Sequence, residues 1–393
     1  MNYFKPLVWQ LLAGMVFSRT ASFMTLPFLA IYMQNELDAP PILIGLAVGI
    51  SSLASTFGGF WGGYLTDLFG RKKIILLAMI GWAIAFFGFA IAHSVWVFIL
   101  LNALNGLSRA FFEPSSQAFM IDHTEQEKRR RLFSIRYTLV NLSAVIGPLI
   151  GVVIAKANSM ATPFIITGSL YVFCFLFFFI VLRNVEEVHR QKEPQNLKGL
   201  VQTLLQDRTL LFMIIGGVFA SFVYSQTNSS LSQLLNLTME DGVTLFSFLI
   251  ATNAFTVLIL QLPLSILTEK MSVKTSLFVG SILLIVGMFA FYVANSWSLY
   301  IVAMVIISLG EIFTFPMIGV IIEMIAPEHQ KATYIGVMQF QSLGGFLGPI
   351  FGGWMIVHFT SQLFLVMTLV AVLMMICYMF AFRGQIAIKH PKV

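Results

Sequence analysis

The spacing of charged residues constrains this sequence more than any other feature. Lysine, arginine, aspartate and glutamate make up only 10% of the 393 residues, against roughly 25% in soluble domains. They are also bunched, so that apolar stretches of about 20 residues lie between them, each long enough to cross about 30 Å of hydrocarbon as a helix. This pattern excludes an ordinary soluble enzyme and indicates a helical protein that crosses the membrane many times.

Twelve membrane spans are predicted from the apolar stretches and the breakers between them. They cover residues 7–33, 42–66, 74–93, 95–121, 132–155, 162–182, 209–235, 243–268, 275–294, 297–325, 332–357 and 360–382. The two cysteines, Cys174 and Cys377, each lie inside such a stretch. They predict neither a disulfide framework nor a metal site.

The basic residues indicate the orientation of these spans. If the N-terminus is cytoplasmic, 20 of the 23 lysines and arginines, Arg136 among them, fall on the cytoplasmic side. Only Lys156 lies outside, and Arg19 and Arg109 lie within spans. The positive-inside rule therefore places both termini in the cytoplasm, and the net charge of +6 reports orientation rather than nucleic-acid binding.

The longest polar connection divides the chain into two sets of six spans. It covers residues 184–208 and contains leucine and valine side chains on one helical face at positions 197, 200, 201, 204 and 205. This spacing predicts a short helix on the cytoplasmic surface of the membrane. We therefore expect a six-helix bundle over residues 1–183, a linker over 184–208, and a second bundle with a short tail over 209–393.

The two halves show signs of an internal repeat. Pro114 and Pro316 lie 202 positions apart, as do Asp67 and Glu269, and the pairs Gly147-Pro148 and Gly348-Pro349 lie 201 apart. Parallel six-helix repeats place a substrate site between the halves near the midplane, and rocking of the halves gives alternating access.

The connection between spans 2 and 3 carries a family motif. Its sequence, Gly63-Tyr-Leu65-Thr-Asp67-Leu-Phe-Gly70-Arg71-Lys72, resembles the major facilitator superfamily motif G-x-L-a-D-r-x-G-r-k. The chain is similar to that superfamily over nearly its whole length, and within it to the twelve-span drug:proton antiporters. One departure is Asn102, which stands where that branch often carries an arginine in span 4.

The resemblance implies a role for this loop in gating. In the family, Asp67 would act on the N-terminus of span 11, where unsatisfied backbone N–H groups carry partial positive charge. Arg71 would pair with the acid that ends span 4, here Asp122. Such contacts would close the cytoplasmic side, with Gly63, Gly70 and Lys72 completing the motif. The alternative is a plain positive anchor at the membrane surface.

Glycine and proline in spans 5 and 11 are similar to the family's antiporter motif. Span 11 carries the complete pattern, and span 5 lacks the first and last glycines. Such residues permit close helix approach and bending, although generic small-residue packing is an alternative. The predicted hinge residues are Gly147, Pro148, Gly151, Gly344, Gly348, Pro349, Gly352 and Gly353.

Four charged residues fall clearly within spans: Arg19, Arg109, Glu113 and Glu311. Embedded charge is costly and is usually functional. Arg109 plus the repeat offset of 202 gives position 311, so Arg109 and Glu311 are expected to face each other across the cavity. Glu113 lies four residues after Arg109, where the two could pair along one helix. Arg19 is expected either to pair with one of the acids or to meet an anionic group of the substrate.

These charges predict how protons are coupled to transport. A carboxyl group in a low-dielectric cavity favours its protonated form, and a nearby arginine favours the ionised form. A change of partner between conformations would then take up or release a proton. We expect Glu311 first and Glu113 second to carry protons, with Arg109 modulating them. A static buried ion pair remains the alternative for each acid.

Polar side chains in the apolar spans are candidate substrate contacts, because lipid does not tolerate a polar run on every side of a helix. Span 7 contributes Gln226, Asn228 and Gln233. Weaker candidates are Asn253 and Gln261 in span 8, and Gln339 and Gln341 in span 11, which helix–helix hydrogen bonds explain equally well.

These features predict a secondary transporter of a bacterial cytoplasmic membrane, acting as a monomer, that exports amphipathic small molecules in exchange for protons. We expect no cofactor, metal or catalytic residue, since the chain has no nucleotide-binding or metalloenzyme motif and the proton gradient would drive transport. A proton-coupled importer or a lipid flippase on the same fold, a non-transporting sensor or scaffold, and a lipid-acting enzyme are the alternatives. The last has no catalytic constellation in its favour.

Overall fold

Helices form the whole framework of the protein. The computed structural model describes residues 4–125, 128–157, 159, 161–185, 207–326, 334 and 337–382, and these residues contain no strand. Within them, twelve helical stretches are long and apolar enough to cross a membrane. This confirms the predicted all-helical membrane fold, and the spans agree with the predicted ranges to within a few residues, except that the described part of span 11 begins later.

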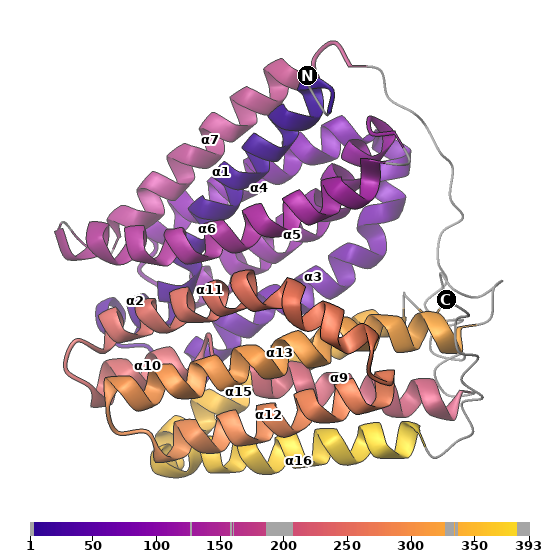
Figure 1. Cartoon of the computed structure of the whole chain (residues 1–393). Helices are drawn as coiled ribbons and strands as arrows, with labels where there is room; N and C mark the ends of the chain where they lie inside the picture. The colour runs from indigo at the N-terminus through magenta and orange to yellow at the C-terminus, as the bar shows by residue number, and fades with distance from the viewer. Residues whose placement is uncertain are drawn as a thin grey trace.

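The first six spans occupy the N-terminal half (Figure 1). They are α1 (Pro6–Thr25), η1 (Leu26–Phe28) and α2 (Leu29–Glu36), followed by α3 (Pro41–Phe69), α4 (Arg71–Ile91), α5 (Val95–Asp122), α6 (Arg129–Ala157) and α7 (Thr162–Leu182). The last six spans are α9 (Arg208–Ser225) with α10 (Ser230–Thr238), α11 (Gly242–Glu269), α12 (Val273–Val293), α13 (Trp297–Ile325), η4 (Gln339–Gln341) with α15 (Ser342–His358), and η5 (Thr360–Gln362) with α16 (Leu363–Ala381).

Local sequence sets several helix starts. Asp207 and Ser272 each accept a hydrogen bond from a backbone N–H three residues ahead, at 3.0 Å in both cases, and so cap α9 and α12. Gly70 precedes α4 with a φ of 86°, a conformation that favours glycine. The glycine of the loop motif therefore allows the tight turn between α3 and α4.

Two of the spans that we expected to be continuous are interrupted. Span 1 contains a 3-10 turn at Leu26–Phe28, where Pro27 cannot donate a backbone hydrogen bond. Span 7 has a turn at residues 226–229 between α9 and α10. Pro27 plus the repeat offset of 202 gives position 229, so the two breaks occupy corresponding places in the halves.

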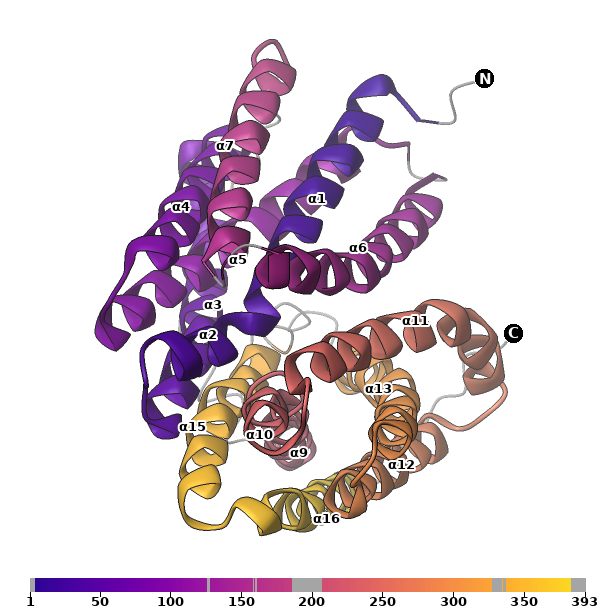
Figure 2. The same ribbon diagram turned by 90° about the vertical axis from the view of Figure 1, so that its left-hand side faces the viewer.

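The helices form two groups, one from each half of the chain (Figures 1 and 2). One hydrophobic cluster consists of buried residues from the first half only. The second belongs to the other half, and Phe28, Ile31 and Val152 join it from the first half. The predicted linker helix lies outside the described residues, as does nearly all of the linker.

The two groups meet at one end of the molecule. Contacts between them join α3 to α15, α6 to α11 and α2 to α10. Three contacts lie beside the loops that follow spans 1, 5 and 7. Lys156 Nζ is 2.7 Å from Asp241 Oδ1, and Asn236 Nδ2 donates to Gln34 Oε1 at 2.9 Å and to Asn35 Oδ1 at 2.7 Å. Toward the end of the molecule where α1 begins and α16 ends, the groups diverge (Figure 1).

Candidate functional site: the cavity between the halves

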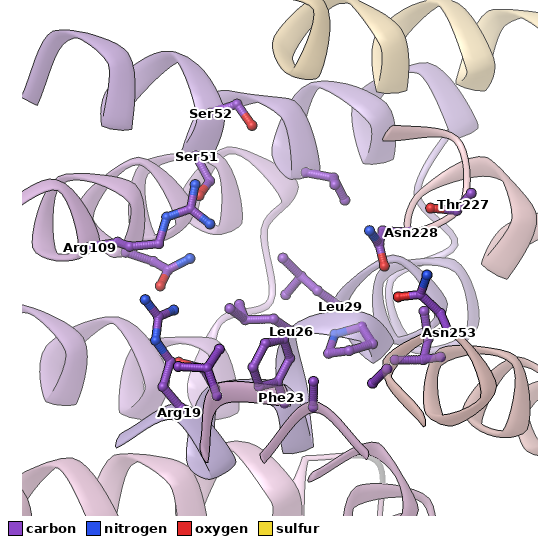
Figure 3. Close-up of a pocket in the computed structure, with 18 of the residues that line it drawn as sticks. Arg19, Phe23, Leu26, Leu29, Ser51, Ser52, Arg109, Thr227, Asn228 and Asn253 are labelled. Carbon is purple, nitrogen blue, oxygen red and sulfur yellow. The ribbon is translucent and has the colours of Figure 1, made fainter. Parts of the chain in front are cut away.

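A cavity of about 390 Å³ lies between the two groups of helices. Arg19 and Arg109 approach it from one side, and Thr227, Asn228 and Asn253 lie on the opposite side (Figure 3). Apolar side chains supply much of the remaining wall, among them Phe23, Leu26, Leu29, Val48, Ile250 and Met304. The mixture of apolar surface and a few polar groups is typical of a binding site for a small organic molecule.

Glu311 lies in the wall of the second half. Its Oε2 accepts hydrogen bonds from Tyr224 Oη at 2.7 Å and from Asn253 Nδ2 at 2.8 Å. Asn253 Nδ2 also lies 3.0 Å from Ser308 Oγ. Glu311 and Asn253 both line the cavity, as we predicted from the sequence. The hydrogen bonds use one carboxylate oxygen, so the other oxygen stays available to a proton or a ligand.

Arg109 lies in the wall of the first half, on α5. Its side chain is exposed within the cavity, and its Nη2 donates a long hydrogen bond of 3.4 Å to Ser55 Oγ. Arg109 and Glu311 therefore border the same cavity from opposite halves, as the repeat offset predicts. No described carboxylate lies within ion-pair distance of Arg109.

Glu113 has partners other than the one expected along its own helix. Its two oxygens form ion pairs with Arg19 of α1 and Arg136 of α6, while Gln117 lies 3.5 Å away. The predicted pairing of Arg19 with an acid is confirmed, and the local pairing of Glu113 with Arg109 is wrong. The physical reason is that α1 and α6 pack beside each other and bring two guanidinium groups to one carboxylate.

Arg136 is a site residue that the charge count misplaced. We counted it on the cytoplasmic side although the predicted span 132–155 contains it, and α6 begins still earlier, at Arg129. Seven residues of helix carry Arg136 about 10 Å along α6. Its guanidinium then reaches Glu113, and its side chain is only 16% exposed.

The polar run of span 7 divides into cavity and packing residues. Asn228 lines the cavity, as does Thr227, which the sequence analysis did not single out. Gln226 and Gln233 are fully buried and do not line it. The structure thus places both side chains in helix packing rather than at the cavity wall, and their contact with substrate remains a prediction. Gln226 donates to the Phe222 carbonyl at 3.1 Å and accepts from Ser230 at 2.5 Å, and Gln233 donates to the Ser229 carbonyl at 3.3 Å.

The weaker candidates in span 11 also lie away from the cavity. Gln339 and Gln341 belong to η4, and neither lines the cavity. The Oε1 of Gln341 lies 2.8 Å from the position that a Cβ on Gly217 would take. Gln341 thus packs against α9, because the small glycine lets its side chain approach, and a substrate contact is not supported.

The loop motif makes one of the two contacts that the resemblance implies. Arg71 forms an ion pair with Asp122 at the end of α5, and Lys72 donates to the carbonyl of Val185. Gly63 and Asp67 belong to α3, but the contacts of the Asp67 side chain and the residues that start span 11 lie outside the described residues. The role of this loop in gating remains a prediction.

Glycines of the two Gly-Pro motifs lie at close helix contacts. A Cβ on Gly147 would lie 2.7 Å from Phe23 Cβ, and Gly151 also faces α1. In the second half, Gly344 and Gly348 face α9, and Gly352 faces Ser230 of α10. Gly353 faces the Pro41 carbonyl of α3. Pro148 and Pro349 lie inside continuous helices, and bending at these sites remains a prediction.

A hydrogen-bonded chain at the cavity was not predicted. Trp82 Nε1 donates to Asn105 Oδ1 at 3.0 Å, Asn105 Nδ2 donates to Asn102 Oδ1 at 2.8 Å, and Asn102 Nδ2 donates to the Ala47 carbonyl at 2.6 Å. All three side chains line the cavity. The three-residue spacing of two asparagines in an apolar span was the available signal, because it places both on one helical face.

Comparison with known proteins assigns the chain to a family. The family model described as the Major Facilitator Superfamily matches residues 11–243 and 213–392. The chain is 31% identical over 352 residues to the uncharacterized MFS-type transporter YqjV of Bacillus subtilis (strain 168), covering 88% of this chain and 86% of that protein. It is 26% identical to a Na(+), Li(+), K(+)/H(+) antiporter of Planococcus maritimus, covering 86% and 87%.

A multidrug resistance protein and two solved structures are also similar. The multidrug resistance protein MdtH of Yersinia enterocolitica is 24% identical, over 85% of this chain and 82% of that protein. A mutant of the peptide transporter POT in complex with alafosfalin has a TM-score of 0.82 at 13% identity, covering 96% and 94%. A mutant of the nucleoside transporter NupG has a TM-score of 0.82 at 16% identity, covering 96% and 100%. At these identities the two structures show the fold alone.

Proposed function

Because this chain belongs to the Major Facilitator Superfamily and is a membrane transporter, we propose that it exports amphipathic small molecules from the cytoplasm in exchange for protons. The observation that carries this proposal is Glu311, the only carboxyl group among the described residues that line the cavity. A single carboxylate in such a place binds either a proton or a polar group of the substrate. Competition between the two at one site is the requirement for antiport.

The arrangement of the halves supports alternating access. The contacts between them lie at the end opposite the start of α1 and the end of α16, where Lys156 meets Asp241. With the termini in the cytoplasm, this is the inward-open state, and the cavity loads substrate from the cytoplasm. Rocking of the halves about the α3–α15 and α6–α11 contacts would then expose the same cavity to the outside.

The names of two relatives each support one part of the proposal. One is named a Na(+), Li(+), K(+)/H(+) antiporter, which agrees with proton exchange, and the other a multidrug resistance protein, which agrees with export of small organic molecules. The complete Gly-Pro motif of α15 also supports exchange, because it resembles the antiporter motif of the family, and its glycines lie at contacts with α9 and α3. An importer or a flippase has no comparable observation in its favour here.

Proton flux in proteoliposomes tests the proposal. Native protein and the variant Glu311→Gln are reconstituted with a pH-sensitive dye inside, and a panel of cationic, neutral and anionic amphiphiles is added under a proton gradient. We expect at least one compound to drive proton movement with the native protein and none to do so with Glu311→Gln. Glu125→Gln is the matched control, because Glu125 is 62% exposed outside the spans.

Two results would contradict the proposal. Equal proton movement by the native protein and by Glu311→Gln would show that coupling occurs elsewhere. No response of the native protein to any compound, in vesicles that retain a proton gradient, would favour a non-transporting role.

A further inference from the structure

The two walls of the cavity carry opposite charge. On the first half, Arg19 and Arg109 line the cavity. Glu113, which does not line it, pairs with Arg19 and with Arg136, so three positive groups of this half stand with one negative group. On the second half, Glu311 is the only described acid that lines the cavity. A molecule in the cavity therefore lies between a positive wall and a negative wall.

Arg109 is the positive group that remains available. Both oxygens of Glu113 are taken by the other two arginines, and among the described residues the only polar partner of Arg109 is Ser55, at 3.4 Å. A guanidinium in a membrane-embedded cavity is costly without a counter-charge. It is also a planar fork of donors that binds carboxylate or phosphate oxygens through two parallel hydrogen bonds.

Hydroxyl groups beside Arg109 extend this anion-binding surface. Ser51 and Ser52 of α3 line the cavity on the same half (Figure 3). Their hydroxyls can donate hydrogen bonds to an anion. On the facing wall, Tyr224 and Asn253 occupy one oxygen of Glu311 with donated hydrogen bonds, which leaves the other oxygen for a cationic group.

From this arrangement we infer that the transported molecule is a zwitterionic amphiphile, with an anionic group bound at Arg109 and a basic group bound at Glu311. The inference rests on the proposed function and specifies its substrate. The basic group and the proton compete for Glu311, which gives exchange. The anionic group uses a separate partner and orients the molecule across the cavity of about 390 Å³.

Four matched probes test the two ends separately. They are 2-naphthylalanine, its amide, its N-acetyl derivative and its N-acetyl amide, which share one aromatic body and carry both charges, only the cation, only the anion, or neither. Binding to the purified full-length protein is measured by calorimetry. We expect the zwitterion to bind about tenfold more tightly than either singly charged probe, the gain typical of a charge-assisted hydrogen-bonded pair.

Two variants assign each charge to its partner. With Arg109→Gln, we expect a probe with a free carboxylate to bind no more tightly than the matching amide. A free amine should still increase the affinity over that of the matching N-acetyl probe. With Glu311→Gln, we expect a free amine to give no increase in affinity, while a free carboxylate still increases the affinity. Arg109→Lys keeps the charge without the planar fork and should retain part of the acid's advantage. The persisting gain in each variant also shows that the variant is folded.

The inference is overturned if the native protein binds the zwitterion no better than the singly charged probes, or binds none of the four. It is also overturned if probes with a free carboxylate still bind Arg109→Gln more tightly than the matching amides do. Proton flux driven by other amphiphiles under either result would leave the proposed antiport intact. Conversely, tight binding of the zwitterion without proton movement would refute the proposed antiport and retain the inferred binding mode.

Discussion

At the scale of single residues, Glu113 and Glu311 have different surroundings although both are acids within spans. Glu113 contacts two guanidinium groups and is only 19% exposed. Glu311 accepts hydrogen bonds from two neutral side chains at the cavity wall. The geometry therefore favours a structural ion pair for Glu113, our second candidate for proton coupling, and leaves Glu311 as the group that we propose for proton exchange.

This difference predicts that Glu113→Gln destabilises the protein. The substitution leaves Arg19 and Arg136 without their carboxylate, and loss of one partner of a buried ion pair costs about 3–5 kcal/mol. Thermal melting of the purified protein measures the effect. Glu125→Gln removes an exposed pair with Lys128 and should leave the melting temperature unchanged. A Glu113→Gln variant as stable as the native protein would contradict the structural role.

The residues also show what sequence patterns cannot resolve. Gln226 and Asn228 lie two positions apart in one polar run, and only the turn between α9 and α10 places Asn228 in the cavity and Gln226 against α15. Arg136 was counted as cytoplasmic although it falls within the predicted span 132–155, because a charge count does not measure depth along a helix. By contrast, the family resemblance implied the pairing of Arg71 with Asp122, and the structure shows that ion pair.

At the scale of helices, α15 contacts both halves through its glycines. Gly344 and Gly348 face α9 of its own half, while Gly345 and Gly353 face Ser52 and Pro41 of α3 in the other half. The sequence predicted close approach here from the Gly-Pro motif. It could not show that successive glycines serve two different neighbours, because that depends on how the two halves pack.

We predict that Gly344→Ala and Gly345→Ala differ in their effects. A Cβ on Gly344 would overlap the Val218 carbonyl and lie 2.6 Å from the Phe222 backbone nitrogen, so α9 and α15 must separate, at a cost of about 1–3 kcal/mol. A Cβ on Gly345 meets only Ser52 side-chain atoms at 3.0 and 3.3 Å. Melting curves compare the variants. Equal loss of stability in both would contradict close α9–α15 packing as the reason for the motif.

At the scale of the whole molecule, the fold was largely predictable, because charge spacing and the 202-residue offset determine the number of spans and their pairing into halves. The interruptions at Leu26–Phe28 and at residues 226–229 were not predicted, because the hydropathy of each span gives no break at these positions. Their equivalent places in the two halves show that the repeat extends to irregular backbone.

The contact between Lys156 and Asp241 predicts a measurable shift between conformations. Both side chains are more than half exposed, so Lys156→Met should change the population of the described state at most about fivefold. Spin labels at Glu36 and Glu240, both exposed on the two halves at this end, report the separation. The distance distribution should broaden toward longer values. An unchanged distribution would show that this ion pair does not contribute to closure.

The same contact has a defined pH dependence. The hydrogen bond from Lys156 lowers the pKa of the Asp241 carboxyl below its ordinary value. The contact is therefore fully present above the ordinary pKa of aspartate, about 3.9, and is lost as pH falls through the lowered value. We expect the label distances to be constant from about pH 5 to 8. A transition within that range would contradict this assignment.

The central claim is that substrate and proton compete for Glu311, and proton release on substrate binding tests it most directly. Purified protein in weakly buffered detergent solution is mixed with a compound that drives proton flux, and the change in pH is recorded. The account predicts release of roughly one proton per molecule bound by the native protein, and binding without release by Glu311→Gln. Equal proton release by the variant would contradict it.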